Sequence, residues 1–226
     1  MDTQFQDISP PSQPPAPIPV QQVSLRTAIA ADGDWAVPLL FASGPALFSY
    51  IFAARSDEAQ TILQQAFVYP GHAFSYEYTQ VVEVAEQPVG LVIAYPGSVK
   101  RTIDDKVHRV MAKILSLRQL PKILVNVADL SRIKQDVPPH AYYILSMSIG
   151  PAYRGRGLGS LLIQDAEAQA RADGYTSVCL DVTYSNQRAK ALFERHGYQV
   201  ICSKATDRFN QMTRAGGIHR LAKPLN

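Results

Sequence analysis

The sequence predicts one α/β domain built around a mixed β-sheet, and two patterns of elements carry that prediction. Alternating apolar residues predict strands at 142–149 and 177–182, and an amphipathic helix at 158–172 lies between them. A strand–helix–strand crossover of this kind joins parallel strands. Apolar runs at 79–85 and 89–95 flank only a short turn, which is typical of an antiparallel hairpin. A sheet that contains both kinds of pairing is mixed.

Size and composition suit a single globular domain. The chain has 226 residues, of which 46% are hydrophobic, and this is enough for one substantial core. Its net charge of +3 is too small to indicate nucleic-acid binding without a concentrated basic patch. Cys179 and Cys202 lie outside any metal-like spacing and are too few for a disulfide framework. We therefore expect reduced thiols and no metal site.

The sequence also bears on where in the cell the protein is found. No apolar run reaches the roughly 18 residues of a membrane span, and the N-terminus lacks the segments of a secretory signal. We therefore expect a cytoplasmic protein with neither a membrane nor a nucleic acid as partner. Residues 1–22 hold six prolines and predict a disordered tail, which leaves 23–226 as the folded domain. A ligand for a proline-recognition domain is the alternative for this tail.

Several helices surround the hairpin. The residues before it predict a strand at 23–28 and helices at 32–41, 45–54 and 56–67. The residues after it, 98–139, predict a helical insert with two apolar stripes and nine Lys/Arg against four Asp/Glu. Two interpretations of these charges stay open. They form the solvated outer face of two packed helices, or a basic wall beside a cofactor's phosphates or an acidic substrate.

The last part of the chain adds one helix and two strands. The helix is predicted at 186–196, and the strands at 198–203 and 217–225. The connection between these strands, 204–216, is polar and predicts a mobile loop.

The most informative segment is 149–159, which has the sequence Ile-Gly-Pro-Ala-Tyr-Arg-Gly-Arg-Gly-Leu-Gly between a strand and a helix. Glycines let backbone N–H groups converge, and a helix N-terminus adds unpaired amides and the positive end of its dipole. This combination predicts a pyrophosphate site. The loop lacks the lysine of a nucleotide P-loop and the glycine spacing of a dinucleotide-binding fold. A purely structural turn is the remaining alternative.

These residues carry a resemblance to a known family. Arg154-Gly155-Arg156-Gly157-Leu158-Gly159 resembles the R/Q-x-x-G-x-G/A signature of the GNAT superfamily of acyl-CoA-dependent N-acyltransferases. The preceding residues, Met147-Ser148-Ile149-Gly150-Pro151, are similar to the family's flanking strand. The later residues are similar to its second motif: Leu180-Asp181-Val182, Asn186, Ala189, Leu192-Phe193 and Gly197-Tyr198. The resemblance is clear over 141–225, weaker over 23–95 and absent from the tail and the insert. It implies a GNAT-like sheet with splayed central strands. The order of the predicted elements places the helical insert between the third and fourth strands.

The resemblance also implies acetyl-CoA as the cosubstrate and no metal. In this family the pyrophosphate lies on the loop amides, and the pantetheine arm pairs with the preceding strand where two strands splay apart. The cofactor-binding residues implied here are Met147, Ser148, Ile149, Arg154, Gly155, Arg156, Gly157, Leu158, Gly159, Ser160, Asn186 and Phe193. Asn186 also fits the role of a helix N-cap.

Direct attack of the amine on the thioester is the reaction that the resemblance implies. The backbone N–H of Ile149 is the expected donor to the carbonyl oxygen. Phe193 stands where many relatives have a tyrosine that acts as the general acid. Three alternatives stay open: the thiolate, with a pKa of about 8.5, leaves without help; Tyr184 supplies the proton; or the activity is impaired.

The general base has three candidates. Asp181 stands where a glutamate serves in the branch that acetylates protein N-termini, but a strand-end hydrogen-bonding role suits it as well. Glu83 in the hairpin is a second candidate, acting through water, with an exposed carboxylate as the alternative. His196 better fits a residue that ends a helix.

The sequence and the resemblance together predict an N-acetyltransferase. It moves an acetyl group from acetyl-CoA to the primary amine of a small molecule, peptide or protein. A second hypothesis is a catalytically weak or inactive acyl-CoA-binding or sensing module, for which Phe193 is the main argument. A third is an interaction protein that uses the proline tail. A homodimer stays open.

Overall fold

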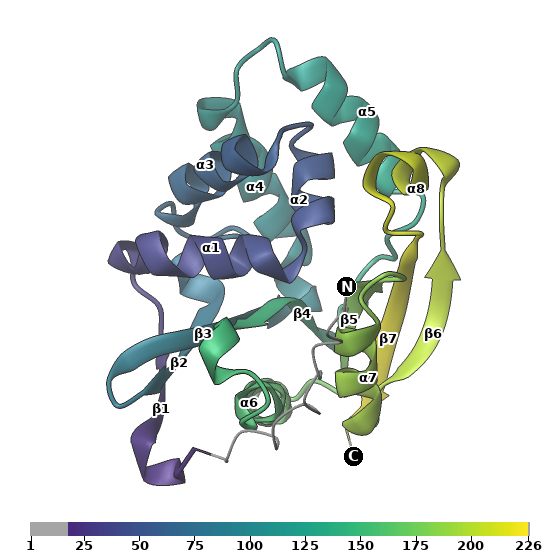
Figure 1. Cartoon of the computed structure of the whole chain (residues 1–226). Helices are drawn as coiled ribbons and strands as arrows, with labels where there is room; N and C mark the ends of the chain where they lie inside the picture. The colour runs from purple at the N-terminus through teal and green to yellow at the C-terminus, as the bar shows by residue number, and fades with distance from the viewer. Residues whose placement is uncertain (1–17, 226) are drawn as a thin grey trace, which may run out of the picture.

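The computed structural model describes residues 18–225, so residues 1–17 of the predicted tail lie outside the described residues. Within this range the chain forms a seven-stranded sheet with the order β1-β2-β3-β4-β5-β7-β6 (Figure 1). The strands are β1 (Val23–Thr27), β2 (Thr79–Val84), β3 (Gln87–Pro96), β4 (Ala141–Ile149), β5 (Ser177–Thr183), β6 (Gln199–Lys204) and β7 (Ile218–Pro224). The α-helices are α1 (Gly33–Ser43), α2 (Pro45–Ile51), α3 (Ser56–Phe67), α4 (Lys100–Ile114), α5 (Leu120–Leu130), α6 (Leu158–Ala172), α7 (Gln187–Arg195) and α8 (Asp207–Thr213).

Strand pairing confirms the mixed sheet. β4 and β5 pair in parallel, as expected of strands joined by the α6 crossover. The pairs β1–β2, β2–β3, β3–β4, β5–β7 and β6–β7 are antiparallel. The β2–β3 hairpin turns through Ala85 and Glu86, which both have positive φ. A two-residue turn of this conformation matches the twist of the flanking strands.

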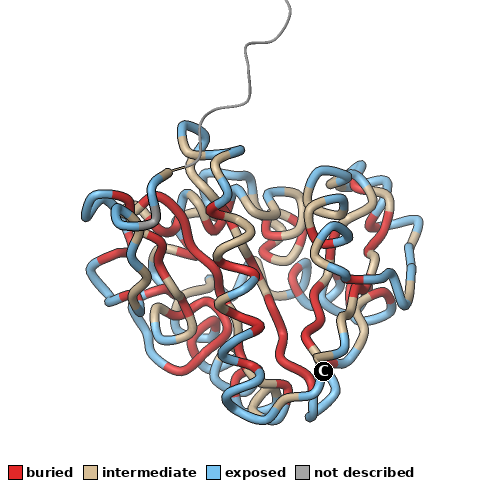
Figure 2. Tube along the Cα trace, turned by 90° about the horizontal axis from the view of Figure 1, so that it is seen from below, coloured by how far each residue is buried: buried red, intermediate tan, exposed pale blue. Residues whose placement is uncertain are grey.

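Helices cover both faces of the sheet, and each face has its own apolar cluster. The cluster beneath α1, α3 and α4 includes Leu40, Leu63 and Ile103. The cluster on the opposite face lies under α6 and includes Leu162 and Ile163. Figure 1 shows α1 and α6 on opposite sides of the sheet, and Figure 2 shows the buried residues running along its strands.

The domain begins slightly before the predicted boundary at residue 23. Ile18 is half-buried and packs against the apolar cluster under α6. The backbone N–H of Ala85 donates a hydrogen bond to the carbonyl oxygen of Gln22. Residues 18–22 therefore contact the first hairpin.

The prediction of a mobile loop at 204–216 was wrong, because this segment contains α8. The Thr206 side chain caps this helix by accepting a hydrogen bond from the Phe209 N–H, a typical N-cap contact. The Phe209 ring is fully buried and lies edge-on to the Tyr50 ring, with centroids 5.1 Å apart. This tertiary contact stabilises a helix too short to be recognised from its polar sequence.

Both helices expected in 98–139 are present as α4 and α5, and α5 is tied to its neighbours by a buried carboxylate. Asp129 accepts hydrogen bonds from the Tyr50 hydroxyl at 2.6 Å and the Thr206 hydroxyl at 2.7 Å. These contacts join α5 to α2 and to the start of α8. The position of α8 therefore depends on α5.

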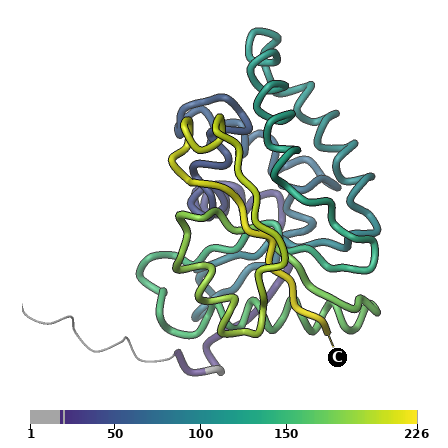
Figure 3. Tube along the Cα trace, turned by 90° about the vertical axis from the view of Figure 1, so that its right-hand side faces the viewer, coloured from purple at the N-terminus to yellow at the C-terminus, as the bar shows by residue number. Residues whose placement is uncertain are grey.

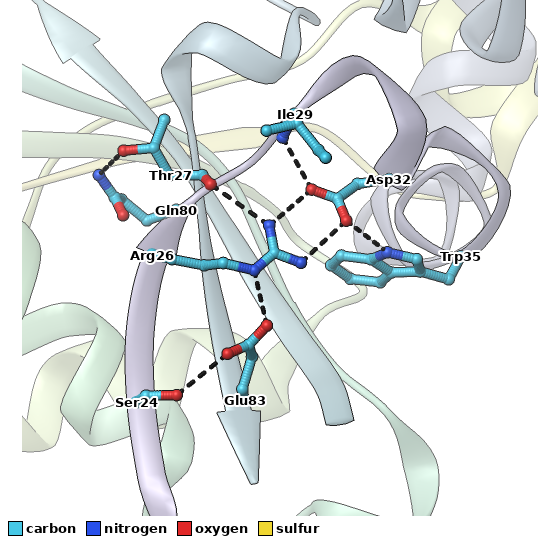
Figure 4. A network of polar contacts seen from close by, with 8 residues as sticks. All are labelled: Ser24, Arg26, Thr27, Ile29, Asp32, Trp35, Gln80 and Glu83. Atoms are coloured by element: carbon cyan, nitrogen blue, oxygen red, sulfur yellow. Dashed lines mark hydrogen bonds and ion pairs between the residues drawn. The ribbon is translucent and has the colours of Figure 1, made fainter. Parts of the chain in front are cut away.

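A polar network fixes the entrance to α1. The Asp32 carboxylate accepts two hydrogen bonds from the Arg26 guanidinium, one from the Ile29 N–H and one from the Trp35 indole. Arg26 also donates to Glu83 on β2 at 2.6 Å (Figure 4). Because the hydrogen bonds from Arg26 outweigh the effect of burial, the pKa of Asp32 is lowered to about 2. The network joins β1, β2 and α1.

We predict that Asp32→Asn lowers the free energy of unfolding by about 1–2 kcal/mol at pH 7, allowing for the solvent exposure of Arg26. Because the folded-state pKa of Asp32 is lowered, its contribution is present above about pH 4 and is lost as the pH falls towards 2. Urea unfolding at pH 7 and pH 3 measures both effects. Asp57→Asn is the matched control, since Asp57 and its partner Arg55 are 69% and 80% exposed. Equal losses in the two variants would contradict this role for Asp32.

Candidate functional site

The site begins where β4 and β5 stop pairing. Their register runs only from Ala141 opposite Ser177 to Ile144 opposite Leu180. Beyond that point, residues 146–149 of β4 still pair with β3 and have no register partner on β5. Figure 1 shows β5, β7 and β6 diverging from the other four strands. This gap confirms the splayed central strands that the sequence resemblance implies.

A β-bulge at Leu145 determines which side chains face each side of the gap. Ile93 lies opposite Ser146, whereas the next residue of β3 lies opposite Ile144, so Leu145 is the extra residue. A bulge of this kind re-aims the following side chains and increases the local twist. The Ser146 hydroxyl therefore meets the Ser43 hydroxyl of α1 at 2.6 Å. Met147 packs against the opposite cluster, under α6.

The backbone at the end of β4 directs the amide of Ile149 into the gap. The N–H of Gly150 donates to the carbonyl oxygen of Val89 at 2.8 Å, on the β3 side. Backbone groups alternate in direction along a strand, so the N–H and C=O of Ile149 point to the other side. The carbonyl oxygen of Ile149 accepts a hydrogen bond from Nε of Arg154 at 2.9 Å.

The glycine-rich loop follows β4 and leads into α6. Gly155 and Gly157 have φ values of 76° and 88°, a conformation that favours glycine. A Cβ atom added at Gly157 would meet no heavy atom within 4 Å, so the space beside this residue is open. The first amides of α6, at Leu158, Gly159 and Ser160, have no carbonyl four residues before them within the helix. The loop therefore presents backbone donors to an open space.

A cleft of about 420 Å³ lies at this point. It is lined by the end of β4, the glycine-rich loop, the start of α6, one face of α7 and the end of α1. The lining residues are Ala42, Ser43, Met147, Ser148, Ile149, Tyr153, Arg154, Gly155, Gly157, Leu158, Gly159, Ser160, Asn186, Arg188, Ala189, Leu192 and Arg195. Ten of the twelve predicted cofactor residues are among them.

The charge of the cleft suits a polyanion. Arg154, Arg188 and Arg195 line it, and none of its described lining residues is Asp, Glu or His. Arg188 and Arg195 were not among the predicted residues, although residues 188, 192 and 195 share one face of a helix. Arg156, in the same loop but outside the lining, has a buried Nε with no hydrogen-bond partner among the described residues. Cationic groups, free helix amides and an open glycine together fit a diphosphate.

Two of the predicted cofactor residues lie outside this lining. Phe193 is 4% exposed and packs in the core with its ring edge-on to Tyr198, at a centroid distance of 5.3 Å. Its position on α7 faces the sheet, so Phe193 supports the cleft from behind. The Arg156 guanidinium lies 5.9 Å from the centre of the Tyr153 ring.

Asn186 is the N-cap of α7 and borders the cleft. Its side-chain oxygen accepts a hydrogen bond from the Ala189 N–H at 3.2 Å, which caps α7. Asn186 also lines the cleft. The cap fixes the first turn of the helix that carries Arg188.

Asp181 lies in a buried ion pair. Its carboxylate accepts from Nε of Arg220 at 2.6 Å and from the Tyr143 hydroxyl at 2.9 Å. The Asp181 and Arg220 side chains are 7% and 3% exposed. Arg220 in turn donates to the backbone oxygens of Gln135 and Asp136. These contacts favour the structural alternative for Asp181 over the catalytic one.

The other predicted acid and base candidates also lie outside the cleft lining. Tyr184 packs its ring against His219, with centroids 4.2 Å apart. Glu83 is engaged by Ser24 and Arg26 in the network at the other end of the sheet (Figure 4). His196 follows α7, and its Nε2 lies 2.9 Å from the Ser160 hydroxyl. His196 therefore supports a residue of the cleft from the end of a helix, as expected.

A second hollow, of about 280 Å³, lies between α4 and α5. Lys134 and Tyr143 are among its lining residues, and Nζ of Lys134 is 3.9 Å from the Asp181 carboxylate. Burial lowers the pKa of the Lys134 ammonium and raises that of the Tyr143 hydroxyl well above its usual range. The basic residues here are balanced by Asp104 and Asp181, so this hollow is less suited to a polyanion.

Two features of residues 18–225 bear on other classes of function. No helix in that range is both long and apolar enough to cross a bilayer. Among the same residues, no three His, Cys, Asp or Glu side chains gather in a way that could hold a metal ion.

Comparison with known proteins agrees with this geometry. Residues 48–198 match the acetyltransferase (GNAT) family. N-alpha-acetyltransferase RimI of Mycobacterium tuberculosis is 36% identical over 78 residues, which are 34% of this chain and 47% of that protein. This chain thus spans about half the length of its curated relative.

Solved structures share the fold. An N-acetyltransferase from Staphylococcus aureus Mu50 aligns with a TM-score of 0.65 at 17% identity, over 88% of this chain and 100% of the other. Another solved acetyltransferase aligns with a TM-score of 0.62 at 19% identity, over 90% of this chain and 100% of the other. Since the family match extends over more than half of the sequence and includes the gap and the glycine-rich loop, the chain belongs to the acetyltransferase (GNAT) family.

Proposed function

We propose that this protein transfers an acetyl group from acetyl-CoA to a primary amine by direct attack, without an acyl-enzyme intermediate. The observation that carries this proposal is the gap beyond Ile144 and Leu180, which opens beside a cationic cleft at the N-terminus of α6. An extended thioester fits the gap while its diphosphate fits the loop amides. The family of the chain supports the choice of acetyl-CoA.

The residues that would hold the coenzyme are those of the cleft. The amides from Gly155 to Ser160 would bind the diphosphate, and Arg154, Arg188 and Arg195 would neutralise its charge. The free edge of Met147–Ile149 would pair with the pantetheine amides as an added strand does. The N–H of Ile149 would donate to the thioester oxygen as negative charge develops there.

Proton transfer in this proposal relies on water. The described residues that line the cleft include no carboxylate or imidazole, and Asp181 and Glu83 are held in ion pairs with arginines. The acceptor therefore reacts as the neutral amine after losing its proton to solvent. On the leaving side, Phe193 has no proton to give, and Tyr184 packs on His219 and is not among the lining residues of the cleft. The thiolate then departs without help, since a thiol pKa of about 8.5 makes it a tolerable leaving group.

The acceptor class is the finer part of the proposal. The name of the curated relative, an N-alpha-acetyltransferase, makes a peptide α-amine the first acceptor to test. A panel of peptide N-termini and small primary amines, followed by release of CoA thiol, measures the preference. Turnover with peptides above that with small amines supports this acceptor. Tight acetyl-CoA binding without turnover on any amine would instead support the acyl-CoA-binding module.

We predict that Gly157→Glu weakens acetyl-CoA binding by at least about 100-fold, because it places a carboxylate and bulk where the diphosphate would lie. Gly174→Glu is the matched control. Gly174 ends α6 with a similar positive φ of 78° and also has open space beside it, but it lies away from the cleft. Calorimetric titration of both variants separates backbone strain from charge. If Gly157→Glu leaves the affinity for acetyl-CoA unchanged, the coenzyme does not bind in this cleft.

We predict that Asp181→Asn lowers the free energy of unfolding by about 3 kcal/mol, because it leaves the buried Arg220 without its counter-charge. The pH dependence of kcat/KM should keep its shape in the folded fraction, and Tyr184→Phe should leave the rate unchanged. Chemical unfolding and pH–rate profiles measure these effects. Loss of an acidic limb of the profile in Asp181→Asn, with stability intact, would restore Asp181 as the base.

A further inference from the structure

The solvent side of α5 is apolar, which is unusual for an outer helix of a globular protein. Leu124, Val125 and Val127 are 66%, 51% and 39% exposed, and Leu117 in the preceding turn is 83% exposed. Pro121 and Ala128 are also exposed on this side. The opposite side of the same helix packs inward through Ile123 and Leu130. We call the outward-facing set the α5 face, with members Leu117, Pro121, Leu124, Val125, Val127 and Ala128.

The surroundings of the α5 face carry charge of one sign. The segment from Lys106 to Ala128 contains five Lys/Arg residues and no Asp or Glu. Arg118 and Lys122 lie beside the apolar residues and are exposed, as are Lys113 before them and Arg132 after them. Asp129, the one acidic residue of α5, is buried against Tyr50 and Thr206. The exposed charged residues of α5 itself and of the turn before it, Arg118 and Lys122, are therefore both cations.

This charge pattern favours an anionic lipid surface over a second copy of the chain as the partner of the α5 face. A second copy docked face to face would bring Arg118 and Lys122 of both copies together, which like-charge repulsion disfavours. An anionic lipid surface satisfies both features at once. Its acyl boundary takes up the apolar side chains, and its headgroups attract the flanking Lys and Arg. No membrane-spanning segment is needed for a helix that lies in the interface.

The position of the α5 face leaves the proposed coenzyme cleft free. Figure 3 shows α4 and α5 projecting at one end of the molecule, and Figure 1 shows α6 at the other end. A flat surface therefore reaches the α5 face without covering the start of α6. From these observations we propose that the α5 face docks the protein on anionic lipid bilayers.

The test is co-sedimentation of the full chain with vesicles of phosphatidylcholine alone and with 30–50% phosphatidylglycerol, at low and high salt. We expect binding to the anionic vesicles only, and weaker binding as salt is raised. Leu124→Glu should reduce that binding by about tenfold or more. Ile201→Glu is the matched control, because Ile201 on β6 is 64% exposed, close to the 66% of Leu124, and lies outside the α5 face. Lys122→Glu should weaken binding without changing thermal unfolding.

Several results would overturn the proposal. They are an absence of binding to anionic vesicles, equal binding to neutral vesicles, or equal losses in Leu124→Glu and Ile201→Glu. Light scattering measures the oligomeric state and so tests whether a second copy of the chain covers the α5 face. A dimer of the wild-type chain that Leu124→Glu dissociates would also contradict a lipid surface. None of these readouts depends on acetyl transfer, so this proposal and the enzymatic one can fail separately.

Discussion

The separation of β4 from β5 after four residue pairs is the constraint on which the rest of the site depends. Parallel strands normally continue pairing until one ends, because unpaired backbone groups inside a fold are costly. Here the bulge at Leu145 twists β4 away, and β5 continues with β7 as its antiparallel neighbour. The freed edge of β4 then points towards a cleft. The fold thus leaves the edge of β4 unpaired beside a cleft in which a ligand can pair with it.

The distribution of charged residues makes the cleft cationic. Three buried carboxylates near the sheet are held by cationic partners: Asp32 by Arg26, Asp181 by Arg220 and Glu167 by Lys223. The cleft itself is lined by arginines. Within this arrangement, the Asp181–Arg220 pair holds β5, β7 and the segment after α5 together.

Sequence reasoning succeeded where local pattern and function coincide. The alternating strands, the α6 crossover and the glycine-rich loop are all local features, and they identified the sheet and ten of the cleft residues. It failed where a tertiary contact decides the outcome. The α8 helix depends on burial of Phe209 against Tyr50, and the pairing of Asp181 with Arg220 joins residues 39 positions apart. Arg188 and Arg195 could have been predicted as cleft residues, because they share a helical face with Leu192.

The most direct measurement is the shift of backbone amide resonances in ¹⁵N-labelled protein on titration with acetyl-CoA. This account predicts that the largest shifts fall on Gly155–Ser160 and on Met147–Ile149, with smaller ones along the first turn of α7. Shifts concentrated instead around the hollow between α4 and α5, with the loop and the end of β4 unmoved, would contradict it.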